Sequence, residues 1–186
     1  MKKKIVIFLF SLFLFSGCLS NSSYKVYVTN TKSFNLLSLD CYTGNNIDEL
    51  YSFEITLNDT SFTCLSMLSI SSTEIYLYIF NEMGVSMGEI IYDGVNLNLD
   101  SPFLPDNLKA EYIISDIQNI FYDKEIIKNH YERKGLKVSE TYTDTITIRT
   151  IEDKNKTIQK ITYYEDSISM HNYLRGYEYV LNRAEN

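Results

Sequence analysis

Apolar and polar residues alternate with a period of two along most of the chain, which is the pattern of β-strands that bury one face. Residues 49–59, ELYSFEITLND, show it most clearly, with Phe53, Ile55 and Leu57 on one face. Residues 74–82, EIYLYIFNE, are apolar on both faces, which indicates a strand that is covered on both sides. The alternation therefore predicts a protein built mainly of strands.

A hairpin and further strands follow from the same pattern. Asp93-Gly94 lies between two strand-like runs and predicts a hairpin, because a type I′ turn requires positive φ at its central residues. The other strand-like runs are 24–30, 35–40, 61–71, 136–142, 144–152, 156–165 and 167–182. The last of them is interrupted near NYLRG.

The period changes to that of a helix in the middle of the chain. Between about 107 and 122, apolar residues recur at spacings of three and four. These residues are Ala110, Ile113, Ile114, Ile117, Ile120 and Phe121. A second, shorter helix is expected at 124–134, with Asp123 as its N-cap and Gly135 as its stop.

The order of these elements predicts a mostly β (α+β) fold. Antiparallel strands come first, then two helices, then about four more strands, and one curved sheet of about eight to eleven strands accommodates this order. We expect the sheet to form a half-open barrel with the two helices against its concave side. The predicted single domain covers residues 24–186, a length that suffices for a real core.

Residues 1–17 have the features of a secretory signal peptide. Residues 2–4 are lysines, and the apolar run at 5–15 is shorter than the roughly 20 residues needed to span a bilayer. Ser16 and Gly17 are small and stand directly before Cys18. A basic start, a short apolar centre and small residues at the end together predict secretion.

The stretch Phe15-Ser16-Gly17-Cys18 resembles the lipobox of bacterial lipoproteins, with Phe15 in place of the usual Leu. In that motif the cysteine is acylated, with chains such as palmitate, and becomes the new N-terminus. The alternative is an ordinary secreted protein with a chance cysteine at the boundary. If Cys18 is acylated, each buried methylene contributes about 0.8 kcal/mol to membrane attachment, and residues 18–23 form a short tether.

The lipobox also predicts a location in the bacterial cell envelope, on the periplasmic side of a membrane. Leu19 follows Cys18, where an Asp would direct enteric lipoproteins to the inner membrane. The outer membrane is therefore expected, under a rule that differs between bacterial groups.

Charge limits the partners. The chain has 17 basic and 24 acidic residues and a net charge of −7, which becomes −10 if the lysines of residues 2–4 are removed. Nucleic-acid binding requires a basic patch, so no nucleic acid is expected as a partner. An acidic domain is not attracted to anionic lipid either, so membrane attachment must be covalent or apolar.

The sequence offers no motif for catalysis, a metal or a cofactor. His130 and His171 lack the neighbours that metal sites require at their usual spacings. Neither a nucleophile elbow nor a phosphate-binding glycine loop is present in the sequence. We therefore expect a protein that is not an enzyme and that uses no cofactor. Cys41 and Cys64 either pair as a disulfide in an oxidising periplasm or remain separate, and the sequence leaves both open.

Three stretches in this order, together with the lipobox, resemble a known family. They are GEIIYDG, LPDNLKAEYIISDIQNIFY and SISMHNYLRGYEYVL. They are similar to bacterial lipoproteins of unassigned function within the superfamily of the lipoprotein carriers LolA and LolB. Members are often associated with the machinery for aryl polyene pigments or related outer-membrane lipids. The resemblance covers roughly residues 35–182 and implies a LolB-like half-open barrel with helices over a cavity for acyl chains.

The apolar faces permit two interpretations, a filled core or a cavity for lipid tails, because both use the same residue types. The candidate cavity residues are Phe53, Ile55, Leu57, Ile113, Ile117, Ile120, Phe121, Ile146 and Ile148. The first functional hypothesis is a membrane-anchored periplasmic lipoprotein that binds or transfers acyl chains of a lipid or lipoprotein without catalysis. The alternative is a structural lipoprotein that scaffolds an envelope complex through a protein partner.

Overall fold

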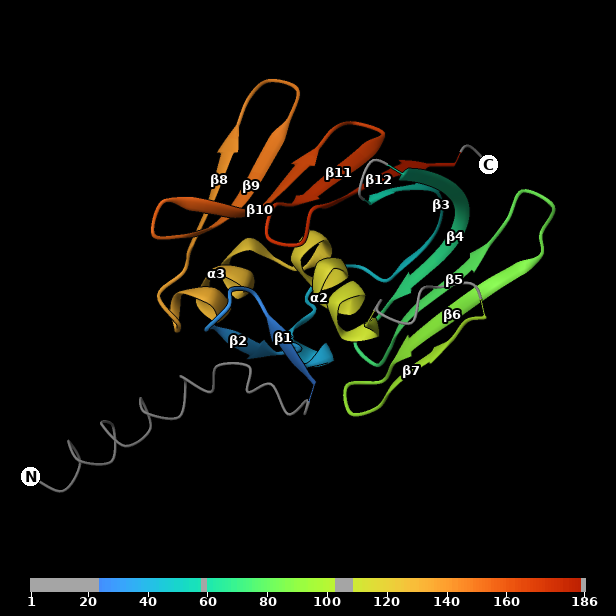
Figure 1. The fold of residues 1–186 in the computed structure, drawn as a ribbon, viewed down its shortest axis with the longest axis horizontal. Coiled ribbons are helices and arrows are strands. Elements are labelled where there is room, and N and C mark those ends of the chain that lie inside the picture. Colours follow the sequence, from blue (N-terminus) through green and yellow to red (C-terminus); the bar gives the residue numbers. More distant parts are fainter. Residues whose placement is uncertain (1–23, 58–59, 103–108, 185–186) are drawn as a thin grey trace, which may run out of the picture.

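The computed structural model describes residues 24–57, 60–102 and 109–184. These residues form a ten-stranded antiparallel sheet, a separate two-stranded sheet and two α-helices (Figure 1). The signal peptide, Cys18 and the tether at 18–23 lie outside the described residues. Within the described residues, no helix combines the length and apolar character that crossing a membrane would require.

The large sheet has the strand order β7-β6-β5-β4-β3-β12-β11-β10-β9-β8. Its strands are β3 (Ile47–Leu57), β4 (Thr60–Ile70), β5 (Ile75–Phe80), β6 (Ser86–Tyr92), β7 (Leu97–Asp100), β8 (Lys137–Tyr142), β9 (Thr147–Asp153), β10 (Lys156–Tyr163), β11 (Ser167–Asn172) and β12 (Tyr177–Arg183). The sheet is curved (Figure 1), and it is not closed, because its edge strands β7 and β8 do not pair with each other. The predicted fold class, mostly β with one curved antiparallel sheet, is confirmed.

One long-range strand pair joins the two halves of the sheet. Strand β12 pairs with β3 in antiparallel register, from Tyr177 opposite Leu57 to Arg183 opposite Tyr51. All other pairs of neighbouring strands in the large sheet are consecutive in the chain, and β7 and β8 form its two edges. The β3–β12 pair therefore brings residues from both ends of the described chain to the centre of the sheet.

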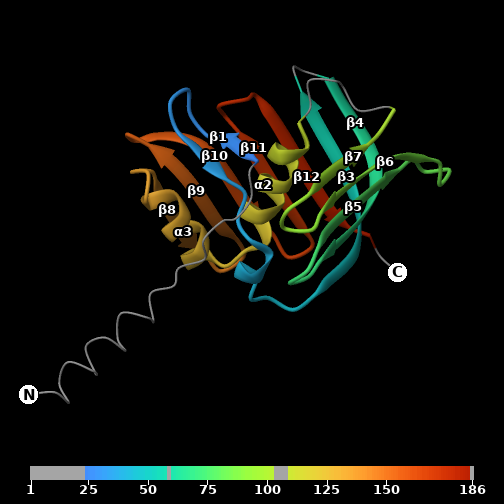
Figure 2. The same ribbon diagram turned by 90° about the horizontal axis from the view of Figure 1, so that it is seen from below.

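The two helices lie within the curve of the sheet, as predicted (Figure 2). Helix α2 (Ala110–Phe121) is the central one, and α3 (Lys124–Glu132) contacts β8. The small sheet of β1 (Lys25–Tyr27) and β2 (Ser33–Asn35) lies against α2 through β1. A short 3-10 helix, η2 (Leu39–Cys41), follows β2. Asp123 caps α3 as expected, since its Oδ1 accepts a hydrogen bond of 2.8 Å from Glu125 N.

The turn chemistry differs from the prediction in one detail. The hairpin at Asp93-Gly94 is present between β6 and β7, but only Gly94 has positive φ, +90°. Asp93 instead holds the turn with its carboxylate, which accepts a 2.6 Å hydrogen bond from Asn96 N. Positive φ at two successive central residues occurs at Lys154 and Asn155, φ 50° and 65°, between β9 and β10. That pair has the backbone signature of a type I′ turn.

Candidate functional site

An apolar cavity of about 350 Å³ lies between α2 and the concave face of the sheet. Its walls come from four strands of the sheet and from the first turn of the helix. The lining residues are Phe53, Ile55 and Leu57 of β3, Phe62 of β4, Leu77 and Ile79 of β5, Tyr177 and Tyr179 of β12, and Tyr112 and Ile113 of α2, with Lys109, Leu174 and Arg175. The volume falls within the range of about 300 to 1,000 Å³ that is usual for small-molecule sites.

The cavity has a buried end and an exposed end. Ile79 and Tyr179 are 4% and 6% exposed, so they form its closed floor. Phe62 and Leu174 are each 38% exposed and mark its mouth, where Lys109 is also exposed. A binding site with an apolar interior and a partly polar opening suits an amphiphilic molecule.

A buried polar network adjoins the cavity. Asp116 of α2 accepts hydrogen bonds from Gln159 Nε2 (2.8 Å) and from the hydroxyl of Tyr177 (2.5 Å). Asn119, one turn further along α2, donates to Gln159 Oε1 and to the hydroxyl of Tyr131, each at 2.9 Å. The network thus ties α2 to α3, β10 and β12, and Tyr177 belongs to both the network and the cavity wall.

Burial raises the pKa of Asp116 from an ordinary value near 3.8 to about 7. The hydrogen bonds from Tyr177 and Gln159 and the positive charge of Arg175 act in the opposite direction but do not overcome the loss of hydration. Asp116 is therefore protonated in part of its population near neutral pH.

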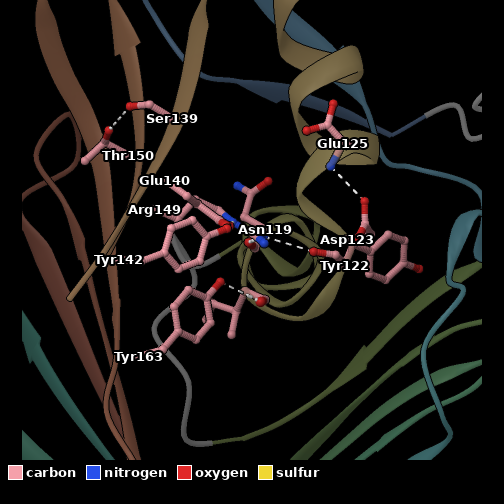
Figure 3. A network of polar contacts seen from close by, with 11 residues as sticks. Asn119, Tyr122, Asp123, Glu125, Ser139, Glu140, Tyr142, Arg149, Thr150 and Tyr163 are labelled. Atoms are coloured by element: carbon pink, nitrogen blue, oxygen red, sulfur yellow. Dashed lines mark hydrogen bonds and ion pairs between the residues drawn. The ribbon is translucent and has the colours of Figure 1, made fainter. Parts of the chain in front are cut away.

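A second polar cluster holds the C-terminal end of α2 (Figure 3). Arg149 Nη1 donates to the carbonyl oxygens of Asn119 (2.6 Å) and Tyr122 (3.0 Å), which have no partners within the helix at this end. Its Nε forms a 2.6 Å ion pair with Glu140, and the two side chains are 7% and 6% exposed. Tyr163 adds a 2.8 Å hydrogen bond to Ile120 O. Arg149 thus anchors the helix to β9.

The opposite side of α2 is fixed by a single amide side chain. Gln118 Oε1 accepts from Leu37 N at 3.0 Å, and its Nε2 donates to Leu37 O at 2.8 Å. The anchors of Gln118 and Arg149 both lie in the C-terminal half of the helix, which they fix to the segment after β2 and to β9. The N-terminal turn, with Tyr112 and Ile113, covers the cavity.

The structure brings four of the nine predicted cavity residues into the lining. These are Phe53, Ile55, Leu57 and Ile113. Ile117 and Ile120 border a gap of only about 20 Å³ deeper in the core, which Ile113 and Phe53 also border. Phe121 is half-buried and lies beside Tyr51, with ring centroids 6.4 Å apart.

Ile146 and Ile148 lie outside the cavity lining. Both are half-buried, whereas Arg149 and Ile151 of β9 are buried and face the helix. Successive side chains of a strand point to opposite faces, so Ile148 points away from α2. The inward position in the middle of β9 is thus taken by a charged residue, which its partner Glu140 makes tolerable.

Several lining residues were not predicted. Leu77 and Ile79 come from the doubly apolar run at 74–82, which gave no indication of which face lines a cavity. The expected strand at 167–182, which is interrupted near NYLRG, contributes Arg175, Tyr177 and Tyr179. The interruption was the sequence signal that could have pointed to these residues. No sequence signal connects these residues with β3, because the pairing spans most of the chain.

Of the two alternatives left open for Cys41 and Cys64, a disulfide between them is not formed, because Cys64 is a free thiol. Cys64 of β4 is 1% exposed, and its Sγ lies 3.6 Å from Phe53 O, to which it donates. Burial raises the pKa of this thiol to about 11, so it is protonated and unreactive at neutral pH. Cys41 is buried in η2.

The two histidines occupy different surroundings. His130 of α3 packs against Phe34, with ring centroids 4.9 Å apart, and burial lowers its pKa to about 4. His171 of β11 lies near Glu178, with 3.6 Å between Nδ1 and Oε2, and stacks on Tyr173. Within the part of the chain that the structure describes, no three His, Cys, Asp or Glu side chains gather as a metal site would require.

The fold and the site define this molecule as a mostly β protein in which an open, curved antiparallel sheet holds an apolar cavity beneath a helix. The chain belongs to the family described as "Protein of unknown function (DUF3261)", which matches residues 52–184. That range begins inside β3 and contains every residue that lines the cavity.

No curated protein matches the chain. One similar solved structure is a crystal structure from Vibrio parahaemolyticus, described as an outer membrane lipoprotein-sorting protein domain. It has 12% sequence identity and a TM-score of 0.28, and the match covers 78% of this chain and 86% of that chain.

Proposed function

We propose that this protein binds the acyl chain of a lipid or lipoprotein in the cavity beneath α2, without a covalent step. The observation that carries this proposal is the cavity of about 350 Å³, whose floor is formed by aliphatic and aromatic side chains. A packed core of the same residues would leave only gaps such as the one of about 20 Å³ around Ile117.

The size of the cavity suits a hydrocarbon chain. If each group of the chain occupies about 30 Å³, as a water molecule does in the liquid, the cavity has room for on the order of ten groups. Transfer of each methylene from water into an apolar site is favourable by about 0.8 kcal/mol. A chain of about ten methylenes therefore gains about 8 kcal/mol, which is comparable to the roughly 4 to 15 kcal/mol of entropy lost on binding.

The same proposal includes membrane attachment. The signal peptide at 1–17 and the lipobox at Cys18 support a lipoprotein that is anchored in the cell envelope and faces the periplasm, with the outer membrane as the expected site. The tether at 18–23 keeps the cavity close to that membrane, so an acyl chain travels a short distance between the two. The association with aryl polyene or related outer-membrane lipids stays a prediction from sequence resemblance.

Native mass spectrometry and lipid extraction of the purified protein test the proposal. We expect bound lipid in the wild type and its loss in Ile55→Trp, because the indole occupies the cavity. Ile148→Trp is the matched control, since Ile148 points away from α2, and it should keep its lipid. A wild-type protein that carries no lipid and accepts none on addition would refute the proposal, and a stable protein partner would then favour the scaffold.

A further inference from the structure

We propose that the cavity selects an acyl chain with an anionic headgroup, which Arg175 and Lys109 hold at the mouth. This inference rests on the proposed function and adds the class of ligand. It is carried by two cationic side chains in the lining of an apolar cavity, of which Lys109 is exposed and Arg175 is half-buried next to the exposed Leu174.

The charge of the lining is opposite to the charge of the chain. The protein has 24 acidic and 17 basic residues. Among the described residues that line the cavity, two are basic and none is acidic. In an acidic protein, a lining of this sign gives the mouth a positive potential that its surroundings lack, and such a potential favours anions.

Arg175 is held in position before any ligand binds. It lies in the turn between β11 and β12, where its backbone N–H donates to Asn172 Oδ1 at 3.1 Å. Its guanidinium lies over the ring of Tyr112, with Cζ 3.7 Å from the centroid, and Nη2 donates to Tyr27 O. These contacts fix the plane of the guanidinium and reduce the entropy that a ligand would otherwise have to remove.

The guanidinium keeps donors for a ligand. An arginine side chain has five N–H donors, and within the described residues one hydrogen bond of this guanidinium is formed, to Tyr27 O. The fork of the remaining donors matches two oxygens of a carboxylate or a phosphate. A neutral headgroup such as a hydroxyl cannot satisfy that fork.

Lys109 supplies a second and more mobile charge. It stands directly before α2 and is exposed, while its neighbour along the lining, Tyr112, is half-buried. An exposed ammonium attracts an anion without fixing its geometry, and salt weakens this attraction. We therefore assign orientation to Arg175 and long-range attraction to Lys109.

The nearest buried acid competes little with such a ligand. Asp116 and Arg175 both border a gap of about 20 Å³ beside the cavity, so the carboxyl faces Arg175 from the inner side. Burial raises the pKa of Asp116, which lowers its negative charge near neutral pH. Asp116 therefore offsets the positive potential of the guanidinium less than a fully ionised carboxylate would.

Displacement of N-phenylnaphthylamine, an uncharged fluorescent probe of apolar sites, tests the inference on lipid-extracted full-length protein. Dodecanoate, dodecyl phosphate and dodecanol share one chain and differ in headgroup; the two anions are added below their micelle concentrations and dodecanol below its solubility limit. We expect at least one anionic ligand to displace the probe at about tenfold lower concentration than dodecanol, as one charged hydrogen-bonded contact would give. The two anions distinguish carboxylate from phosphate recognition.

Variants separate the headgroup from the cavity. Arg175→Gln should lose most of the tenfold preference, Lys109→Gln should lose a smaller and salt-sensitive part, and Arg175→Lys should retain some of it. Lys160→Gln on β10 removes one charge outside the lining and should change nothing. Probe fluorescence in each variant shows that the cavity is still formed.

The outcomes are distinct. If neither the probe nor any chain binds to the wild type, the proposed function fails and the inference with it. If the three chains displace the probe equally and Arg175→Gln has no effect, the inference is overturned while acyl-chain binding stands.

Discussion

The hydroxyl of Tyr177 donates a 2.5 Å hydrogen bond to Asp116, so a residue of the cavity wall is also part of the buried polar network. The same hydroxyl accepts a 3.0 Å hydrogen bond from Asn172 Nδ2. The position of Tyr177 therefore depends on the network, and the network depends on the strand that closes the cavity. A substitution in the polar network is therefore expected to affect the cavity wall, and a substitution in the cavity wall at Tyr177 is expected to affect the network.

Tyr177→Phe should destabilise the protein and raise the pKa of Asp116 further. The variant removes the hydrogen bond that lowers this pKa and leaves a buried carboxyl and the Asn172 amide short of a partner. An unsatisfied buried polar group costs about 1 to 3 kcal/mol. Urea denaturation measures the loss, and Tyr164→Phe, which removes the hydroxyl of a tyrosine that is 49% exposed, controls for the loss of a hydroxyl without touching Asp116. An unchanged unfolding midpoint would contradict the role given to this bond.

The pH dependence of stability should carry the signature of Asp116. Its pKa is about 7 in the folded protein and near 3.8 when it is exposed, so between these values the unfolded chain loses a proton that the folded protein keeps. The contribution of Asp116 to the free energy of unfolding is therefore fully present below about pH 4 and is lost as pH rises to about 7.

Comparison with Asp116→Asn isolates this contribution. The stability difference between wild type and variant should shift against the wild type from about pH 4 to about pH 7 and then level off. His130, with a pKa lowered to about 4, gives the opposite slope, but it is present in both proteins and cancels. Urea denaturation at several pH values measures the difference, and a difference that does not vary with pH would show that Asp116 does not titrate in this window.

The buried ion pair of Arg149 and Glu140 leads to a third prediction. Arg149→Met leaves Glu140 unpaired at 6% exposure and removes the donors to Asn119 O and Tyr122 O. Loss of one partner of a buried pair costs about 3 to 5 kcal/mol. Thermal or urea unfolding measures it.

A surface ion pair provides the control for that prediction. Arg183 lies 2.7 Å from Glu49, with side chains 59% and 35% exposed. Arg183→Met should therefore change stability by less than about 1 kcal/mol. Equal losses in the two variants would mean that burial and helix anchoring add nothing to the Arg149 pair.

The fold was largely predictable because it depends on local patterns. The alternation at 49–59 placed Phe53, Ile55 and Leu57 on the inner face of β3, and helical spacing placed Ile113 toward the sheet. These assignments need only the period of each element. The curvature and the place of the helices follow from strand number and element order.

The site was less predictable because it depends on which side chains meet across the chain. Ile148 was expected inside, but Arg149 takes that place because Glu140 of the neighbouring strand pairs with it. From the sequence alone, a charged residue such as Arg149 is predicted to be exposed. Its burial is explained only by its partner Glu140, which the sequence does not identify. Arg175 likewise depends on stacking with Tyr112, a contact between a turn and a helix far apart in sequence.

Two neighbouring isoleucines of α2 distinguish a cavity from a packed core. Ile113 lines the cavity, whereas Ile114 is 0% exposed and is not part of the lining. Enlarging a side chain in a packed core costs about 1 to 3 kcal/mol, because neighbours must move. Ile113→Phe should cost less than Ile114→Phe, since its added atoms enter empty space, and it should reduce probe binding while Ile114→Phe leaves binding in the folded fraction intact. Urea denaturation and N-phenylnaphthylamine fluorescence measure both effects. Equal destabilisation with unchanged probe binding would mean that the space beneath α2 is not the binding site.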